Sequence, residues 1–287
     1  MAQKEMDDVS GVETTGHEWD GIKELNNPLP RWWLWTFYAC IVWAIAYVIF
    51  FPALPVSGSK GVLGYSSRAE VAQEMVEARE AQSGMYAKMT SLSLDEIRAD
   101  PEAFQFAVAG GRAAFAVNCS QCHGAGASGG PGYPNLNDDD WLWGGSLDSI
   151  YQTLQHGIRF QQNEETRQSL MPAFGRDGIL EPAQIEAIAE YSMQLGGLEH
   201  DAAKAAEGAP LYAENCAACH GEKGEGDREQ GAPKLADAIW LYAGDASQIA
   251  RQIHDPKHGV MPAWGHRLPE ATIRQLAIYV HSLGGGE

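Results

Sequence analysis

Two five-residue stretches of this sequence carry cysteine and histidine in the same order. The residues are Cys119, Cys122 and His123 in the first stretch and Cys216, Cys219 and His220 in the second. In a Cys-x-x-Cys-His stretch the two thiols can add to the two vinyl groups of a haem, and the adjacent imidazole can ligate its iron. The sequence therefore predicts two covalently bound haem c groups, attached by these cysteines and ligated by these histidines.

Structural zinc sites and redox-active dithiols are the alternative interpretations of paired cysteines. Zinc sites of this kind separate two Cys-x2-Cys pairs by about 15 to 20 residues, whereas the pairs here lie much farther apart and each is followed directly by histidine. The fifth cysteine, Cys40, lies in an apolar run and is expected to be a small buried or lipid-facing residue. Haem is favoured because the complete pentapeptide occurs twice in matching contexts.

Two methionines are the candidates for the second axial ligand of each iron. Met171 and Met261 each begin a Met-Pro-Ala-aromatic-Gly turn downstream of a haem motif. Proline fixes the backbone beside the ligand, and glycine permits a close return of the chain. A single methionine would be interpreted as core filler, but recurrence of the same turn favours ligation. The other possible ligands are His156, His254, His258, His266 and Met193.

The haem motifs and the methionine turns belong to a duplicated unit of sequence. Residues 106–198 and 203–286 contain the same signals in the same order: a helix before the haem motif, a Pro-x-Leu segment, a Trp-Leu-aromatic segment, the methionine turn and a last helix. Each methionine is expected to ligate the haem of its own repeat. The crossed arrangement stays open, because the short linker between the repeats makes the two haems neighbours.

The chain before the repeats predicts a single membrane helix. Residues 1–30 are polar and acidic, and the prolines that end them separate this segment from an apolar span at residues 31–52. The span is long enough to cross a hydrocarbon core of roughly 30 Å. A cleaved signal peptide and a buried core helix are the alternatives, but the long acidic lead and the full-length apolar run favour an uncleaved anchor.

Residues 53–105 are predicted to form a tether with short helices. The segment after the span is rich in proline, glycine and serine, which is typical of a linker. A capping box from Ser93 to Glu96 then indicates the start of a helix that approaches the first haem motif.

The charge of the chain restricts its partners. A formal net charge of -18 at pH 7 argues against binding to nucleic acid, because phosphate would be repelled, and favours a basic protein as the surface partner. Orientation in the membrane does not follow from charge, since Lys23 and Arg31 before the span are balanced by Lys60 and Arg68 after it.

The N-terminal residues join the repeats to a known family pattern. Residues 17–22 read His-Glu-Trp-Asp-Gly-Ile, and residues 27–33 read Asn-Pro-Leu-Pro-Arg-Trp-Trp. With one membrane helix and two haem-binding repeats, nearly the whole chain resembles the dihaem cytochrome c subunit (subunit III, CcoP or FixP type) of cbb3-type cytochrome c oxidases. The resemblance implies an all-α fold, with one N-terminal transmembrane helix followed by two tandem class-I-like cytochrome c domains, and it implies Met171 and Met261 as axial ligands.

The resemblance also implies what the chain does. A subunit of this kind has no catalytic residue of its own. It accepts electrons from a basic soluble or membrane-bound cytochrome c and passes them, through a monohaem cytochrome c subunit, towards a catalytic haem-copper subunit that reduces oxygen to water. A stand-alone membrane-anchored electron shuttle is one alternative. A dihaem redox enzyme, such as a peroxidase or a thiosulfate dehydrogenase, is the other.

The same resemblance implies location and docking. The chain is expected in the bacterial inner membrane with residues 1–30 in the cytoplasm and both haem domains in the periplasm, because haem attachment of this type is completed there. Residues 1–51 are expected to dock on membrane helices of the catalytic subunit. The first repeat has a longer loop at residues 157–170 than its counterpart at residues 255–260, and that loop is expected to serve docking.

Overall fold

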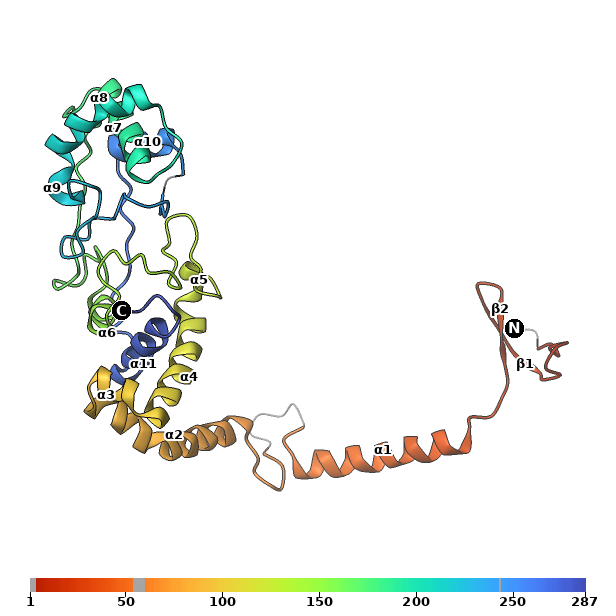
Figure 1. Ribbon diagram of the computed structural model, residues 1–287. Helices are drawn as coiled ribbons and strands as arrows, with labels where there is room; N and C mark the ends of the chain where they lie inside the picture. Colours follow the sequence, from red (N-terminus) through yellow and green to blue (C-terminus); the bar gives the residue numbers. More distant parts are fainter. Residues whose placement is uncertain (1–3, 54–59, 243) are drawn as a thin grey trace. The chain divides into compact units, whose positions relative to one another are not determined.

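The computed structural model describes residues 4–53, 60–242 and 244–287, which divide into two compact units, Met1–Ala81 and Gln82–Glu287. The fold is mostly helical, as predicted, and one small sheet near the N-terminus is its only sheet among the described residues (Figure 1).

The first unit contains a β-hairpin that is not among the predicted elements. Strands β1 (Thr14–Trp19) and β2 (Ile22–Leu25) pair antiparallel. The two residues between them, Asp20 and Gly21, have φ of 50° and 84°, which is the backbone that a tight hairpin turn requires and that an Asp-Gly pair favours. That dipeptide is the sequence signal that indicates the hairpin.

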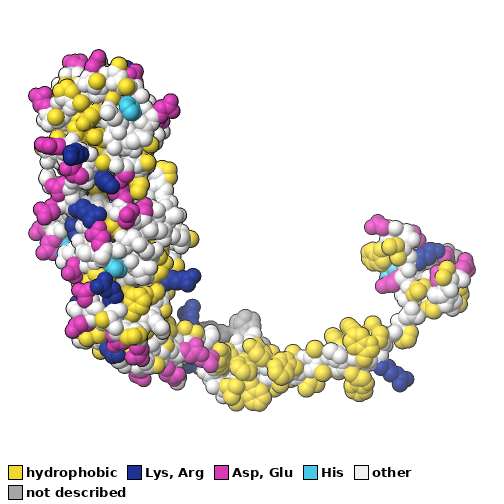
Figure 2. Space-filling model, viewed as in Figure 1, with side chains coloured by type: hydrophobic (Ala, Val, Ile, Leu, Met, Phe, Trp, Pro, Cys, Tyr) yellow, Lys and Arg dark blue, Asp and Glu magenta, His cyan; other side chains and the backbone are white. Residues whose placement is uncertain are grey.

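Helix α1 (Arg31–Phe50) follows the hairpin. It begins after Pro30, has 20 residues and a mean hydropathy of 1.8, and none of its side chains is buried. Its hydrophobic side chains lie along the whole helix (Figure 2). By length and composition α1 could cross a membrane, and it ends two residues before the predicted end of the span.

Residues 53–105 are predicted to contain short helices, and the structure instead has one long helix and one short helix there. α2 (Ser67–Ser91) has 25 residues, so the expectation of only short helices is wrong for this stretch. α3 (Leu94–Ala99) begins at the predicted capping box. The Ser93 hydroxyl accepts a hydrogen bond from the Glu96 N–H at 3.2 Å, and the Glu96 carboxylate accepts one from the Ser93 N–H at 2.7 Å.

Eight further helices build the part of the second unit that contains both Cys-x-x-Cys-His motifs. They are α4 (Pro101–Asn118), α5 (Ser120–His123), α6 (Leu147–His156), α7 (Pro182–Leu195), α8 (Ala202–Asn215), α9 (Ala217–His220), α10 (Ala246–His254) and α11 (Glu270–His281). The first helix of each repeat packs against the last helix of the other repeat: α4 against α11, and α8 against α7. In the same way α6 packs against α11, and α10 packs against α7.

The described residues form three hydrophobic cores, and the two that contain a motif cysteine do not coincide with the sequence repeats. The inner core is built from one continuous stretch, residues 171–253, and contains Cys216. The outer core is built from residues 114–154 and 261–283, on either side of that stretch, and contains Cys119. One core is therefore nested in sequence within the other.

The two helix crossings are equivalent in detail. A Cβ atom at Gly111 of α4 would lie 2.2 Å from the carbonyl oxygen of Gln275, and one at Gly208 of α8 would lie 2.0 Å from that of Ala187. Glycine is required at both places because the backbones touch. An aromatic pair lies beside each crossing: Phe115 with Tyr279 at 5.5 Å between ring centroids, and Tyr212 with Tyr191 at 5.2 Å.

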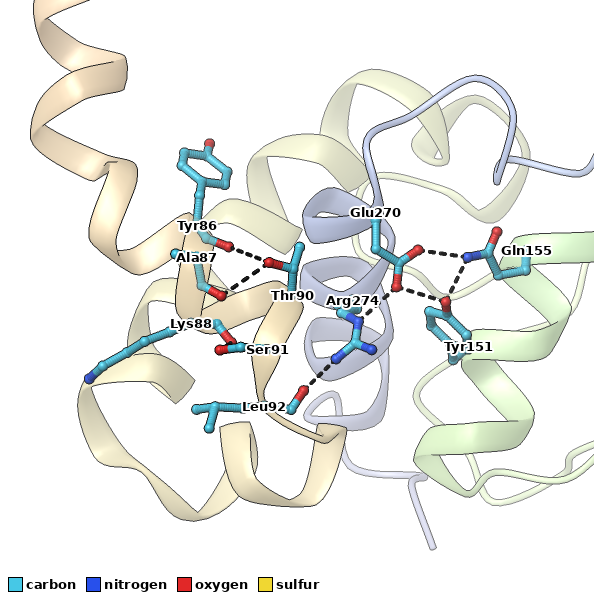
Figure 3. Close-up of polar contacts among 10 residues, drawn as sticks. All are labelled: Tyr86, Ala87, Lys88, Thr90, Ser91, Leu92, Tyr151, Gln155, Glu270 and Arg274. Carbon is cyan, nitrogen blue, oxygen red and sulfur yellow. Dashed lines mark hydrogen bonds and ion pairs between the residues drawn. The ribbon is translucent and has the colours of Figure 1, made fainter.

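A polar cluster fastens α6 of the first repeat to α11 of the second (Figure 3). The Glu270 carboxylate accepts hydrogen bonds from the Tyr151 hydroxyl at 2.8 Å, from Gln155 Nε2 at 2.8 Å and from Arg274 Nε at 2.7 Å. Arg274 also donates to the carbonyl oxygen of Leu92, just before α3. The outer core thus has a second connection between its two separate segments.

Candidate functional site

Each haem motif forms the same short helical turn at the end of a longer helix. Cys119 caps α4 and Cys216 caps α8, and both side chains are buried in a core. Cys122 and Cys219, one turn later, are exposed. Their backbone N–H groups donate to the carbonyl oxygens of Cys119 and Cys216, at 3.1 Å in both motifs. Each motif therefore presents one thiol to the interior and one to the rim of a core.

Burial keeps one thiol of each motif in its neutral form. Burial, with a smaller contribution from the neighbouring cysteine, raises the pKa of Cys119 and of Cys216 to about 11. Redox-active cysteines react as thiolates, which a raised pKa disfavours. Within residues 4–53, 60–242 and 244–287, no group of three or more His, Cys, Asp or Glu side chains is arranged to hold a metal ion.

The two motif histidines are oriented by backbone carbonyl groups. His123 Nδ1 lies 3.1 Å from the carbonyl oxygen of Pro134, and His220 Nδ1 lies 2.9 Å from that of Pro233. When Nδ1 carries the proton and donates it to a carbonyl oxygen, Nε2 is left with a lone pair for a metal. Burial lowers the pKa of both imidazoles, which also favours the neutral ligand form.

The prolines are functional positions that the sequence analysis missed. Pro134 and Pro233 belong to the Pro-x-Leu segments that recur in both repeats, so their recurrence was the available signal. Their role is carried by a backbone carbonyl, which every residue type has, and residue type alone therefore could not identify it.

The methionine turns lie with the haem motifs of the opposite repeats. Met261 packs against the outer core, which contains Cys119, and Met171 packs against the inner core, which contains Cys216. Of the two arrangements that the sequence leaves open, this packing favours the crossed one, because α4 pairs with α11 and not with α7. Ligation by either thioether stays a prediction.

The remaining ligand candidates contact protein groups. His156 Nδ1 lies 3.2 Å from a Glu165 carboxylate oxygen, and His266 stacks on Phe160. His258 Nε2 accepts a hydrogen bond from the Met171 N–H at 3.0 Å. Met193 is buried in the inner core. A Cβ atom at Gly175 would lie 2.2 Å from the His254 ring, so that ring packs against the methionine turn. Three of these side chains therefore support the methionine turns or the core.

Buried side-chain N–H groups that lack a hydrogen-bond partner test whether the residues present fit a bound haem. The side-chain N–H groups Trp143 Nε1, Arg167 Nε and Trp240 Nε1 are buried and have no hydrogen-bond partner among the described residues. An unsatisfied buried donor costs about 1–3 kcal/mol, so acceptors are expected there. Trp240 packs against the inner core, which contains Cys216. Because a haem carries carboxylates in addition to its iron, the donor set fits a bound haem.

The loop at residues 157–170 connects the outer core to the inner core. Ile158 exchanges two backbone hydrogen bonds with Met261, at 2.9 Å and 3.0 Å. The base of the loop is therefore part of the surroundings of a ligand turn. Its tip is exposed at Gln161, Gln162, Glu164 and Glu165, and docking by that tip stays a prediction.

Two family models match the chain. The model "N-terminal domain of cytochrome oxidase-cbb3, FixP" matches residues 11–58, and "Cytochrome C oxidase, cbb3-type, subunit III" matches residues 106–191 and 203–280. The chain is 53% identical over 288 residues to the cbb3-type cytochrome c oxidase subunit FixP of Rhizobium etli, with 100% of both chains covered. It is 52% identical over 276 residues to subunit CcoP of Cereibacter sphaeroides, covering 96% of this chain and 95% of that one. Subunit CcoP of Azospirillum brasilense is 50% identical over 296 residues, with 100% of both chains covered.

Proposed function

Because the chain belongs to the family of cbb3-type cytochrome c oxidase subunit III, we propose that it receives electrons from a donor cytochrome c and delivers them towards a haem-copper subunit that reduces oxygen. Membership makes the chain a cytochrome c electron-transfer subunit with two covalently bound haem c groups. The observation that carries the proposal is that each core brings together one Cys-x-x-Cys-His motif and one methionine turn. Haem c supplies reversible one-electron chemistry when it is bound there.

Different residues of each core would attach the haem, orient its histidine ligand and supply its second ligand. The cysteines hold it covalently, so it is retained in both oxidation states. The carbonyl groups of Pro134 and Pro233 keep His123 and His220 in the tautomer and orientation that ligation requires. Thioether ligation from Met171 and Met261 would raise the reduction potential, which suits electron acceptance from another cytochrome c.

The arrangement favours electron transfer over catalysis in the chain itself. A dihaem enzyme needs an iron that is open or differently ligated, whereas here a methionine turn lies in the core of each haem motif. A stand-alone shuttle would need an anchor but not the N-terminal family segment that matches at residues 11–58. No residue is therefore assigned a catalytic role.

The donor in this proposal is a basic soluble or membrane-bound cytochrome c. The formal net charge of -18 would steer a basic partner to the surface, at a rate that falls as salt screens the charges. Figure 2 shows Asp and Glu side chains spread over the haem-binding unit. The rate of reduction by a basic cytochrome c, followed by stopped flow, is expected to fall as ionic strength rises. A rate that does not depend on salt would contradict electrostatic steering.

The proposed location is the bacterial inner membrane, with α1 as a single span. Its length and apolar composition support the anchor. The orientation, with the N-terminus in the cytoplasm and the haem-binding unit in the periplasm, follows from where haem c is attached in this family. A protease that cannot cross the inner membrane, added to spheroplasts, should cleave the chain and release the haem-binding unit. Resistance to that protease would contradict the orientation.

Purification of the full chain from its own membranes tests the oxidase role. The tagged chain, extracted in mild detergent, is expected to bring with it a monohaem cytochrome c and a copper-containing haem protein, and the sample should reduce oxygen when a reduced cytochrome c is supplied. Haem and copper are measured on the same sample. A chain that purified with two haems but without copper or partner subunits would overturn the oxidase role and would favour the stand-alone shuttle.

A further inference from the structure

Arg159 lies where the chain passes from the outer core to the inner core. Its Nε donates to the carbonyl oxygen of Gly259 at 2.6 Å, and its Nη1 donates to that of Ser169 at 3.2 Å. Gly259 lies two residues before Met261, and Ser169 lies two residues before Met171. One guanidinium group therefore holds the segments that lead into both methionine turns.

The backbone at Arg159 indicates that this side chain is needed there. Its φ of 51° is in the left-handed region, which glycine adopts freely and a residue with a side chain adopts at a cost. Backbone bonds hold it in place: its own N–H donates to the carbonyl oxygen of Arg167 at 2.8 Å, while the preceding residue, Ile158, is paired with Met261. Since strain of this kind persists where the surroundings enforce it, an arginine at this position calls for a functional explanation.

The Arg159 guanidinium group forms its hydrogen bonds with backbone carbonyl groups, so it can fix the position of the backbone. Among the described residues it forms no ion pair with a carboxylate, although the chain has 38 Asp and Glu residues. Arg176, which precedes the inner core's α7, instead forms an exposed ion pair with Asp255. The planar fork of arginine can donate to two carbonyl groups at fixed angles, which lysine does not reproduce.

A second contact joins the same two segments. His258 precedes Gly259 in the chain, and its Nε2 accepts a hydrogen bond from the N–H of Met171 at 3.0 Å. The segment leading to one methionine thus supports the backbone of the other, and Arg159 donates to both segments. The two turns therefore share one hydrogen-bonded frame, although they serve different cores.

We propose that Arg159 is a positioning residue shared by both methionine turns, which holds the two thioethers in place for ligation so that the sixth ligands of both haems respond together to its loss. The inference rests on the proposed function, because it presupposes that Met171 and Met261 are the ligands. It adds that the two sites are coupled through one side chain outside either haem motif.

The test compares variants of the full haem-loaded chain in detergent. Arg159→Gly removes the guanidinium group and leaves a residue that favours the observed φ, so the backbone is expected to keep its path. The readouts are the long-wavelength charge-transfer band of the thioether–iron bond, both midpoint potentials and the carbon monoxide affinity of each ferrous haem. We expect a weaker band, two lowered potentials and a carbon monoxide affinity about tenfold higher at both haems, because the competing thioether is held by fewer hydrogen bonds.

Two further variants separate positioning from charge and from general damage. Arg159→Lys keeps the charge without the fork, so it should still weaken the band at both haems. Arg98→Ala removes an exposed ion pair with Asp95 in α3, away from both methionine turns, and should leave both haems unchanged. If Arg159→Gly fails to load haem, the Arg159→Lys result decides: a lysine variant that matches the native chain overturns the inference.

The remaining outcomes distinguish this inference from the proposed function. If only one haem responds to Arg159→Gly, or neither does, Arg159 does not serve both turns. If Met171→Leu and Met261→Leu also leave the charge-transfer band and both potentials unchanged, the ligation itself is wrong. If the two leucine variants change the haems and Arg159→Gly does not, ligation stands and only the shared positioning falls.

Discussion

At the scale of single residues, both motif histidines depend on backbone carbonyl groups that set their orientation. Cysteine and histidine in a fixed order carry a chemical signature, and the structure gives both motifs the same turn. The supporting groups are the carbonyls of Pro134 and Pro233 and the guanidinium of Arg159, and the three act through or upon backbone atoms. Such contacts depend on how distant segments fold together, so residue type does not reveal them.

Substitution of the methionines tests the crossed arrangement. In a chain that carries haem only on Cys119 and Cys122, because Cys216 and Cys219 are replaced by alanine, Met261→Leu is expected to lower the potential of the single haem. Met171→Leu in the same chain should leave that potential unchanged, since Met171 lies in the inner core. Redox titration measures both. The opposite result would restore pairing within each repeat.

Asp140 is predicted to make stability depend on pH. Burial, with the nearby carboxylates of Asp237 and Asp138, raises its pKa from 3.8 to about 6. The folded chain therefore binds this proton more tightly than the unfolded chain, and the contribution of Asp140 to stability falls as pH rises through the window from about 4 to about 6. Asp140→Asn should remove this dependence and stabilise the fold at neutral pH by roughly 1–2 kcal/mol, a value reduced for partial solvent screening.

The measurement for Asp140 is the unfolding midpoint in denaturant, taken at about pH 4 and about pH 7. Asp139, which is exposed, provides the control: Asp139→Asn should leave the difference between the two pH values as it is in the native chain. If Asp140→Asn destabilises the fold at neutral pH, the carboxylate is a stabilising partner and the assignment of a raised pKa is wrong.

At the scale of elements, the sequence predicts helices better than it predicts their partners. The capping box at Ser93 correctly indicates a helix start. The sequence does not indicate which helices pack together, because α4 and α8 carry the same pattern of glycine and aromatic residues. The faces of α11 and α7 that they contact are also alike. The Asp20-Gly21 hairpin shows the reverse case, in which a local signal was sufficient and was overlooked.

The glycine crossings give a prediction about stability. Gly111→Ala would place a methyl group 2.2 Å from the carbonyl oxygen of Gln275, and overpacking of this kind costs about 1–3 kcal/mol. Gly84→Ala is the matched control, since it is the same change within a helix where a Cβ atom meets nothing within 4 Å. That control should be neutral or stabilising by about 0.5–1 kcal/mol.

Thermal unfolding followed by helical circular dichroism compares the two glycine variants. Gly208→Ala, at the equivalent crossing of α7 and α8, should resemble Gly111→Ala. If both variants unfolded at the same temperature as the native chain, the helices would not approach as closely as described, and the nested pairing would lose its main support.

At the scale of the whole molecule, the order of the repeats along the chain does not determine which helices pack together. The sequence analysis correctly predicts two haem motifs on a mostly helical chain, but tandem repeats suggest two separate cores placed one after the other. Only residues 196–201 separate α7 from α8, so pairing these neighbours closes a very short loop at little entropic cost. α4 and α11 are then left to pair with each other, and one core becomes nested within the other.

The N-terminal part is proposed to attach the chain to the oxidase. A bare anchor needs only hydrophobic length and interfacial residues, yet α1 has a shallow apolar hollow along one side. It is lined by Trp35, Tyr38, Ala39, Val42, Trp43 and Ala46. Small residues between aromatic ones allow another membrane helix to approach closely, which lipid alone would not select. The family segment that matches at residues 11–58 includes this helix.

Replacing residues 1–51 by an unrelated single-span anchor should keep both haems and the membrane location but abolish co-purification with a copper-containing oxidase. A finer test is Ala39→Leu combined with Ala46→Leu, which fills the hollow and should weaken association. Ala44→Leu makes the same change on the same helix outside the hollow and should have no effect. Copper content per covalent haem in the purified sample measures association. If the exchanged anchor still co-purified with the oxidase at full stoichiometry, assembly would depend on the haem-binding unit alone, because no native membrane contact would remain in that chain.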